Sequence, residues 1–393
     1  MARYRIFVTL ITFLVLAIFG SIAILYARGY RLSFDEDNRN LQIGPQGLLV
    51  ANSDPNGAQV FVDGELKTAT NNTISLAPKS YDVEIKKEGF LSWKKKVTIE
   101  KETVTQIDGF LIAAAPSLTA LTFSGVFNPI PSPDNTKIAY GVPSTPENGA
   151  DKAGLWILET VDLPLGFNRD PRRITDGDLT EAKWEWSPDG RQIMLTTKNS
   201  IFLLDTGVFT PQSQRSNIVS QLENIQKEWD TEREKRLQSK LSGIADEIEK
   251  VFVRSATNIY FSPDEERIIY TARADDSIPE NVVTQLPGSS TQPQERNIKT
   301  GQTYVYDIKE DRNFAVGSET DKLSWLPTSI NLLQPQEDKI IIKDYDNMNE
   351  QVVFSGGYSF PHAYATSSSN RILILTSLGG NSEYPNLYWL SLK

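Results

Sequence analysis

The residues that most often carry enzyme chemistry are scarce in this chain of 393 residues, which has no cysteine and one histidine, His362. Without cysteine there is no thiol nucleophile, disulfide, iron–sulfur cluster or Cys-ligated zinc, and one imidazole is too few for most catalytic zinc sites. No orienting carboxylate can be identified near His362 in the sequence, so we expect a structural or surface histidine rather than an acid–base catalyst. We therefore expect no metal and no cofactor.

The remaining catalytic motifs are equally weak. The chain has no Gly-x-Ser-x-Gly elbow, no phosphate-binding glycine loop and no His-Glu-x-x-His. Ser92 and Lys95 have the Ser-x-x-Lys spacing but lie in strand-like sequence without partner motifs. The 50 acidic residues leave one enzymatic alternative open, a surface hydrolase that uses two carboxylates in a central channel.

The charge distribution limits the class of partner. The chain has 40 Lys and Arg against 50 Asp and Glu, and its first 31 residues contain four Arg and no acid. Beyond that end the protein is therefore distinctly acidic, which disfavours nucleic acid and favours protein or neutral glycan partners.

A membrane anchor is predicted at the N-terminus. The stretch from Ile6 to Ala27 holds no charge, Pro or Asn, and as a helix it would be about 33 Å long, enough to cross a bilayer. A signal peptide cleaved after Ser21-Ile22-Ala23 is the alternative, but that site lies inside the apolar run. Basic residues flank both ends of the stretch, so their count does not decide its orientation. Because the N-terminal tail is short, we expect residues 1–31 to form a cytoplasmic stub and anchor, with the rest of the chain outside the cytoplasm.

Residues 32–45 are polar and acidic and are predicted to be a spacer, and a small β-domain is predicted for residues 46–112. Its apolar and polar residues alternate with the period of strands buried on one face, and turns such as Asp63-Gly64 and Glu88-Gly89 separate them. This favours a compact antiparallel sandwich. The order of Asp54-Pro55-Asn56-Gly57-Ala58, then Val62-Asp63-Gly64, Tyr81-Asp82-Val83 and Gly89-Phe90 resembles the PEGA domain family, although Lys67-Thr68-Ala69-Thr70 replaces its usual Gly-x-Thr-Pro step. The resemblance implies a surface interaction or spacer module without catalytic residues.

One segment of this domain is a candidate interaction surface. It combines two aromatic residues with a lysine run, and its members are Phe90, Trp93, Lys94, Lys95 and Lys96. Such a mixture can contact lipid headgroups or an anionic polymer. The alternative is a solvated face, because lysines also protect strand edges from pairing with other chains.

Residues 113–393 contain a repeat. Ser-Pro-Asp follows an apolar residue in Pro131–Asp134, Trp186–Asp189 and Phe261–Asp264, and each copy precedes apolar strands. Proline presets φ, the aspartate caps the turn and glycine accepts positive φ, so we assign Asp134, Asp189, Gly190 and Asp264 to turn formation rather than catalysis. Two diverged copies follow near Ser324 and Ser367. A repeated four-stranded unit of about 40 residues is typical of a β-propeller.

The repeat is similar to that of TolB-like propellers, best where Ile174-Thr175 precedes Trp186-Ser187-Pro188-Asp189-Gly190. The resemblance implies a mainly β fold with five blades, or six if a diverged blade forms with Leu121-Thr122-Phe123. It implies no function, because propellers serve as binding proteins, scaffolds and enzymes.

Two insertions interrupt the repeats. Residues 211–252 carry apolar residues at helical spacing, and a break near Ser239–Gly243 predicts a helical hairpin. Its Leu222, Trp229 and Leu237 are either partner-binding residues or packing residues against the propeller wall. Residues 274–301, rich in Ser, Pro, Gln and Asn, are predicted to be a flexible loop. The sequence thus predicts a single-pass, exported, non-catalytic binding or scaffolding protein of the cell envelope.

Overall fold

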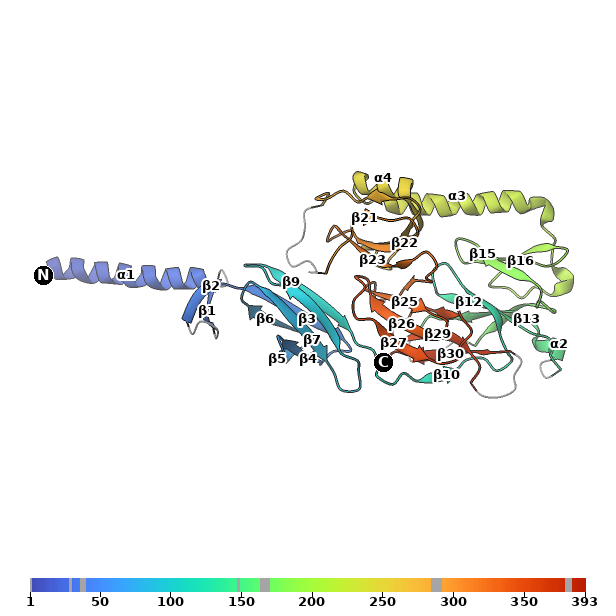
Figure 1. Cartoon of the computed structure of the whole chain (residues 1–393), viewed down its shortest axis with the longest axis horizontal. Coiled ribbons are helices and arrows are strands. Elements are labelled where there is room, and N and C mark those ends of the chain that lie inside the picture. Colours follow the sequence, from blue (N-terminus) through green and yellow to red (C-terminus); the bar gives the residue numbers. More distant parts are fainter. Residues whose placement is uncertain are drawn as a thin grey trace. The chain divides into compact units, whose positions relative to one another are not determined.

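The computed structural model describes residues 2–27, 30–35, 40–146, 149–162, 170–283, 292–378 and 384–393. The chain divides into two units, one ending at Leu111 and the other beginning at Ile112 (Figure 1). The fold is mainly β, as the sequence predicts. Each unit is described by itself.

The first unit begins with α1 (Ala2–Ala27), whose stretch Phe7–Tyr26 is long and apolar enough to cross a membrane. Its described side chains are exposed, so the protein itself provides no apolar cover for this helix. The predicted spacer contains most of a two-stranded antiparallel hairpin, β1 (Tyr30–Asp35) and β2 (Asn40–Pro45), which the sequence analysis did not foresee.

Residues 47–110 form two sheets. The strands are β3 (Gly47–Asp54), β4 (Gln59–Val62), β5 (Glu65–Ala69), β6 (Asn72–Leu76), β7 (Ser80–Lys86), β8 (Trp93–Thr98) and β9 (Val104–Phe110). The sheet orders are β6-β3-β9 and β5-β4-β7-β8. Alternate residues of each strand, among them Leu49, Val60, Val83 and Trp93, meet in one buried core. The expectation of a wholly antiparallel sandwich is wrong at one pair, because the last strand β9 returns to lie parallel to the first, β3.

The second unit contains six antiparallel sheets in its described residues, of which five have three or four strands. The first sheet is β11 (Phe127–Pro131), β12 (Lys137–Val142), β13 (Gly154–Glu159) and β14 (Arg172–Asp176). The second is β15 (Lys183–Trp186), β16 (Gln192–Thr196) and β17 (Ile201–Asp205). The third is β18 (Ala256–Phe261), β19 (Arg267–Ala272), β22 (Gln302–Asp307) and β23 (Arg312–Ser318). The fourth is β24 (Ser324–Trp325), β25 (Asn331–Pro335), β26 (Lys339–Asp344) and β27 (Gln351–Ser355).

The fifth sheet unites both ends of the unit. It consists of β28 (Ala363–Tyr364), β29 (Arg371–Thr376), β30 (Asn386–Ser391) and β10 (Leu118–Ala120), with β10 paired to β30. The strand before Leu121 therefore completes the last sheet and does not start a sixth blade. In the other three four-stranded sheets and in the three-stranded sheet, each strand pairs with the next strand of the same sheet along the chain. This up-and-down order is the repeating unit expected of a propeller.

Buried apolar residues join neighbouring sheets. One cluster combines Leu155 and Ile157 of the first sheet with Trp184 and Ile193 of the second. Another joins the first sheet to the fifth, and a third joins the third sheet to the fourth. The sheets are thus held face to face by side chains that alternate along their strands.

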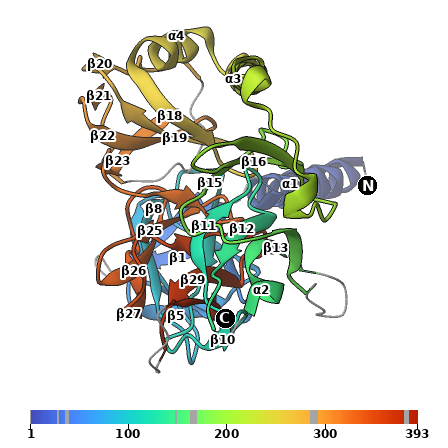
Figure 2. The same ribbon diagram turned by 90° about the vertical axis from the view of Figure 1, so that its right-hand side faces the viewer.

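The insertion after β17 is helical, as predicted, but its helical part continues to Ser255. After short 3-10 turns at Gln212–Gln214 and Val219–Gln221 come α3 (Leu222–Leu241) and α4 (Asp246–Ser255). In Figure 1, α3 runs above β15 and β16 toward α4, and Figure 2 shows both helices beside β18 and β19. A shorter helix, α2 (Gly149–Lys152), precedes β13.

The second predicted insertion is only partly described. Near its two ends, β20 (Asp276–Ser277) pairs with β21 (Asn297–Ile298). Its Leu286–Ser290 segment lies outside the described residues.

Candidate functional site

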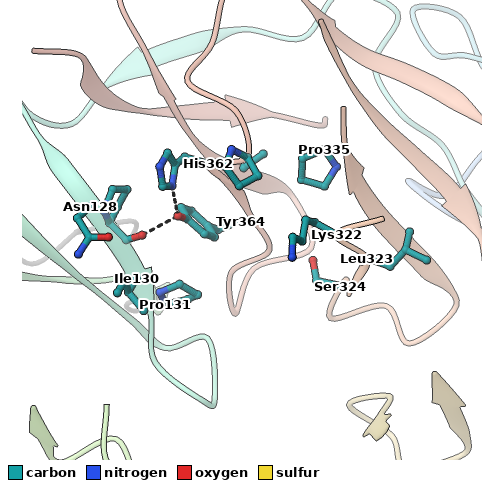
Figure 3. A pocket seen from close by; sticks show the side chains of 12 residues that line it. Asn128, Ile130, Pro131, Lys322, Leu323, Ser324, Pro335, His362 and Tyr364 are labelled. Atoms are coloured by element: carbon teal, nitrogen blue, oxygen red, sulfur yellow. Dashed lines mark hydrogen bonds between the residues drawn. The ribbon is translucent and has the colours of Figure 1, made fainter. Parts of the chain in front are cut away.

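A pocket of about 380 Å³ lies where the first strands of three sheets come together (Figure 3). We name it the β11–β24–β28 pocket. Twelve residues line it: Asn128, Pro129, Ile130, Pro131, Lys322, Leu323, Ser324, Pro335, Pro361, His362, Ala363 and Tyr364. Seven of these are Pro, Ile, Leu or Ala, so a few polar groups stand in a mostly apolar wall, as is usual for ligand sites.

A bulge in β11 shapes one wall of the pocket. The pairing of β11 with β12 shifts register between Phe127 and Ile130, and Asn128 has a positive φ of 46°. Asparagine tolerates this conformation better than most residues. Asn128 and Pro129 are therefore outside the regular ladder, which leaves the carbonyl of Pro129 able to accept a hydrogen bond from another sheet.

The same bulge recurs in β18. Its register shifts between Thr257 and Tyr260, and Asn258 has a φ of 50°. In both copies the asparagine stands six residues before the turn aspartate. This spacing is a sequence signal for the bulge that was not recognised above. It marks the place where the first strand of a sheet leaves the regular hydrogen-bond ladder.

Backbone carbonyls of these first strands accept bonds from aromatic side chains of another sheet. The indole of Trp186 donates to Ile130 O at 3.0 Å, and that of Trp325 donates to Tyr260 O at 3.4 Å. Tyr364 OH donates to Pro129 O at 2.6 Å. These bonds fix the first strands β11 and β18 relative to the sheets beside them.

His362 takes its orientation from Tyr364. Its Nδ1 lies 2.5 Å from the Tyr364 hydroxyl, whose only hydrogen is donated to Pro129 O. In this arrangement the hydroxyl accepts from His362, so Nδ1 carries a hydrogen and Nε2 is left as an acceptor. Burial lowers the pKa of His362 and so favours the neutral ring. The group that orients His362 is therefore the phenol of Tyr364 and not a carboxylate.

Three further polar side chains of the pocket have no partner of their own in the described part of the chain. They are the amide of Asn128, the ammonium of Lys322 and the hydroxyl of Ser324. Figure 3 shows Lys322 and Ser324 beside each other and across the pocket from Asn128. Asn128 is far in sequence from Lys322 and Ser324, and only the packing of the sheets brings it to them.

A second pocket, of about 490 Å³, lies at the Ser-Pro-Asp turns of the first two sheets. Its lining consists of Pro133, Asp134, Pro188, Asp189, Arg191 and Arg236. Asp134 Oδ1 accepts bonds from Ser132 Oγ at 2.6 Å and Thr136 Oγ1 at 2.8 Å, and Asp189 Oδ1 accepts one from Ser187 Oγ at 2.6 Å. Both carboxylates are thus engaged within their own turns.

These bonds also act on the ionisation of the two carboxylates. Burial opposes ionisation of Asp134, but hydrogen bonds from Ser132 and Thr136 outweigh it, so its pKa is lowered. The bond from Ser187 is the main cause of the lowered pKa of Asp189. Asp264 repeats the turn, accepting from Ser262 Oγ at 2.5 Å, and Gly190 has the positive φ of 65° that such a turn needs.

In the lysine-rich segment of the first unit, the lysines lie at the surface but the two aromatic residues do not stand free beside them. Trp93 is only 3% exposed and belongs to the core, because it takes an inward position of β8, and Phe90 is half-buried against the same core. Lys94 pairs with Glu84 at 3.3 Å and Lys96 with Asp82 at 3.8 Å. Lys95 lies between them in sequence, is half-buried, and also has an interaction partner. Acidic neighbours therefore offset much of this positive charge.

The three apolar residues that the sequence singles out in the helical insertion are buried or half-buried. Trp229 is 8% exposed, Leu222 is half-buried, and Leu237 packs beside the buried cluster that contains Leu241 and Phe252. The packing alternative of the sequence analysis describes these side chains better than partner binding does.

Comparison with known proteins identifies the first β-domain. Residues 46–112 match the PEGA domain, which confirms the resemblance drawn from the sequence. No curated protein matches the chain.

Solved structures show weak similarity over larger parts of the chain. A putative TolB from Agrobacterium tumefaciens is 13% identical over 66% of this chain and 76% of its own, with a TM-score of 0.22. TolB from Acinetobacter baumannii is 13% identical over 85% and 64%, with a TM-score of 0.20. The acylaminoacyl peptidase of Pyrococcus horikoshii is 12% identical over 68% and 38%, with a TM-score of 0.21. The function must therefore be argued from this chain's own residues.

Proposed function

We propose that this protein is a membrane-anchored binding protein of the cell envelope, and that its ligand enters the β11–β24–β28 pocket. One observation carries the proposal: four polar side chains, His362 Nε2 included, converge in a mostly apolar pocket and are available to a ligand. Convergent polar groups in apolar walls give a site orientation and specificity. Protein or glycan partners remain the expected class.

Binding accounts for these groups better than the alternative, a surface hydrolase with two carboxylates. The residues described as lining the β11–β24–β28 pocket include no Asp or Glu. Asp134 and Asp189 do meet in the second pocket, but both have lowered pKa values. A glycosidase needs one carboxyl with a raised pKa to serve as the acid, which neither provides.

The anchor supports the location. The 20 residues Phe7–Tyr26 form one apolar helix with exposed side chains, and lipid is the environment that suits such a surface. We propose that the helix remains on the mature chain and that the PEGA domain and the sheets of the second unit lie outside the cytoplasm.

Site-specific photo-crosslinking tests the binding function. A photoreactive amino acid replaces Lys322 in the pocket, and in a separate variant it replaces the exposed Lys198, in the loop between β16 and β17. In cells that produce the protein, we expect a discrete adduct from position 322 that position 198 does not form. Equal adducts from both positions, or none from position 322, would contradict the proposal.

A further inference from the structure

We propose that the β11–β24–β28 pocket binds the C-terminal residue of a peptide, with Lys322 receiving the α-carboxylate and His362 accepting the hydrogen of the last peptide N–H. This inference rests on the proposed binding function and specifies its ligand.

The acceptor role of His362 follows from its hydrogen bonds. A carbonyl oxygen has no hydrogen to give, so Tyr364 must be the donor in its bond to Pro129 O. The same hydroxyl then accepts from Nδ1 of His362. Nε2 of the neutral ring is left without hydrogen, and it can take an N–H group from a ligand but cannot give one.

Lys322 supplies the complementary charge. Within the residues that the structure describes, its ammonium makes no ion pair or hydrogen bond, and it lies at the pocket beside Ser324 (Figure 3). A carboxylate would be held there by a charge-assisted hydrogen bond, and the hydroxyl of Ser324 can donate a second one. An amide N–H and a carboxylate joined to the same carbon atom are the chemical features of a peptide C-terminus.

The walls favour a peptide over an acidic sugar. Pro129, Pro335, Pro361 and Leu323 offer apolar surface for one side chain of the last residue. An N-acylated acidic sugar also carries an amide and a carboxylate, but its several hydroxyls would lose water against these prolines without gaining partners. The chemistry of the lining therefore selects the peptide.

The test uses the full chain in detergent and two fluorescein-labelled pentapeptides, Gly-Gly-Ser-Ala-Leu with a free carboxylate and the same peptide with a C-terminal amide. Fluorescence polarisation measures the dissociation constant of each. We expect the free acid to bind about tenfold more tightly than the amide, because the charge-assisted bond is lost in the amide.

Matched variants assign the two contacts. K322M should weaken binding of the free acid about tenfold and remove the preference over the amide, whereas K198M, which changes an exposed lysine elsewhere, should change neither. H362N keeps a donor near the position of Nδ1 but removes the acceptor at Nε2, so it should weaken binding. H362Q places an acceptor near Nε2 and should bind more tightly than H362N. Melting temperatures show that each variant is folded.

Each contrary result has a defined meaning. Equal binding of acid and amide, or equal binding by K322M and the native protein, overturns the carboxylate contact. Binding of N-acetylneuraminic acid without binding of the peptide overturns the peptide in favour of an acidic sugar. Absence of peptide binding together with the position-322 adduct would reject this ligand while leaving the proposed binding function intact.

Discussion

At the residue scale, the turn aspartates show how one side chain can set a repeated connection. Asp189 Oδ1 accepts from Ser187 Oγ and from the backbone N–H of Arg191, and Asp134 makes the equivalent bonds to Ser132 and Thr136. Each carboxylate thus closes the link between the first two strands of its sheet. Because the bonds favour the ionised form, the turns should weaken in acid.

This gives a pH prediction. The lowered pKa of Asp189 in the folded state means that its charge contributes stability above the unfolded pKa of about 3.9, and that this contribution is lost as the pH falls toward the folded pKa. D189N keeps an acceptor oxygen but no charge. We expect it to lower the urea midpoint at pH 6 and to lower it by less at pH 2. An equal effect at both pH values would show that the charge contributes nothing.

Gly141 marks a close approach beside the pocket. A Cβ added there would lie 2.2 Å from Cζ of Phe127, whose residue pairs with Gly141 across β11 and β12. The Phe127 ring packs against the ring of Trp184, with centroids 5.7 Å apart, so moving it would disturb that contact. The absence of a side chain at Gly141 is therefore a packing requirement.

We expect G141A to lower the free energy of unfolding by about 1–3 kcal/mol, the usual cost of overpacking. G357A is the matched control, because a Cβ added at Gly357 has no atom within 4 Å. Urea unfolding measures both. Native-like stability of G141A would mean that the Phe127 ring moves freely.

At the scale of elements, α3 contacts both the second and the third sheet, and α4 packs on the third. Arg233 pairs with Glu185 of β15, and Lys240 pairs with Glu265 in the turn after β18 at 2.8 Å. Phe252 of α4 is fully buried, with ring centroids 4.8 Å from Tyr270 and 5.9 Å from Tyr306. Deleting residues 211–252 would expose this aromatic face, so point variants are the better test of the insertion.

We expect F252A to cost about 3–5 kcal/mol of unfolding free energy, because it opens a cavity among buried rings. V253A, at the neighbouring position with a 52% exposed side chain, should change stability by less than about 0.5 kcal/mol. Chemical denaturation of the two variants checks this. Equal losses would show that α4 is not packed as described.

At the scale of the whole molecule, thiol labelling distinguishes which side of the membrane holds the residues that follow the apolar helix. The absence of cysteine makes the native chain a ready background for labelling. S239C places a thiol at an exposed position of α3, and A2C places one before the apolar stretch.

We expect a membrane-impermeant maleimide to label S239C in intact cells and to label A2C only after permeabilisation, because the short N-terminal tail should stay inside. The reverse pattern would refute export. The intact mass of the purified chain distinguishes an anchor from a cleaved signal peptide.

The sequence by itself determined the elements of this protein, because strand alternation, helical spacing and turn residues are local properties. The PEGA resemblance, the repeated strands and the helical insertion with its break near Gly243 were all readable in this way. The parallel pairing of β3 with β9 and the union of β10 with β30 were not, since both join strands distant in sequence.

Only the tertiary structure decided the candidate site. Asn128 lies in the first strand of one sheet, and Lys322 and His362 lie just before the first strands of two others. No local pattern states that these sheets meet. Tertiary packing also decided the burial of Trp93. In the sequence it stands beside a lysine run like a surface aromatic, but in the structure it is buried in the core between the two sheets. The physical reason is that burial and convergence depend on which faces pack together, whereas strand and turn propensities act within a few residues.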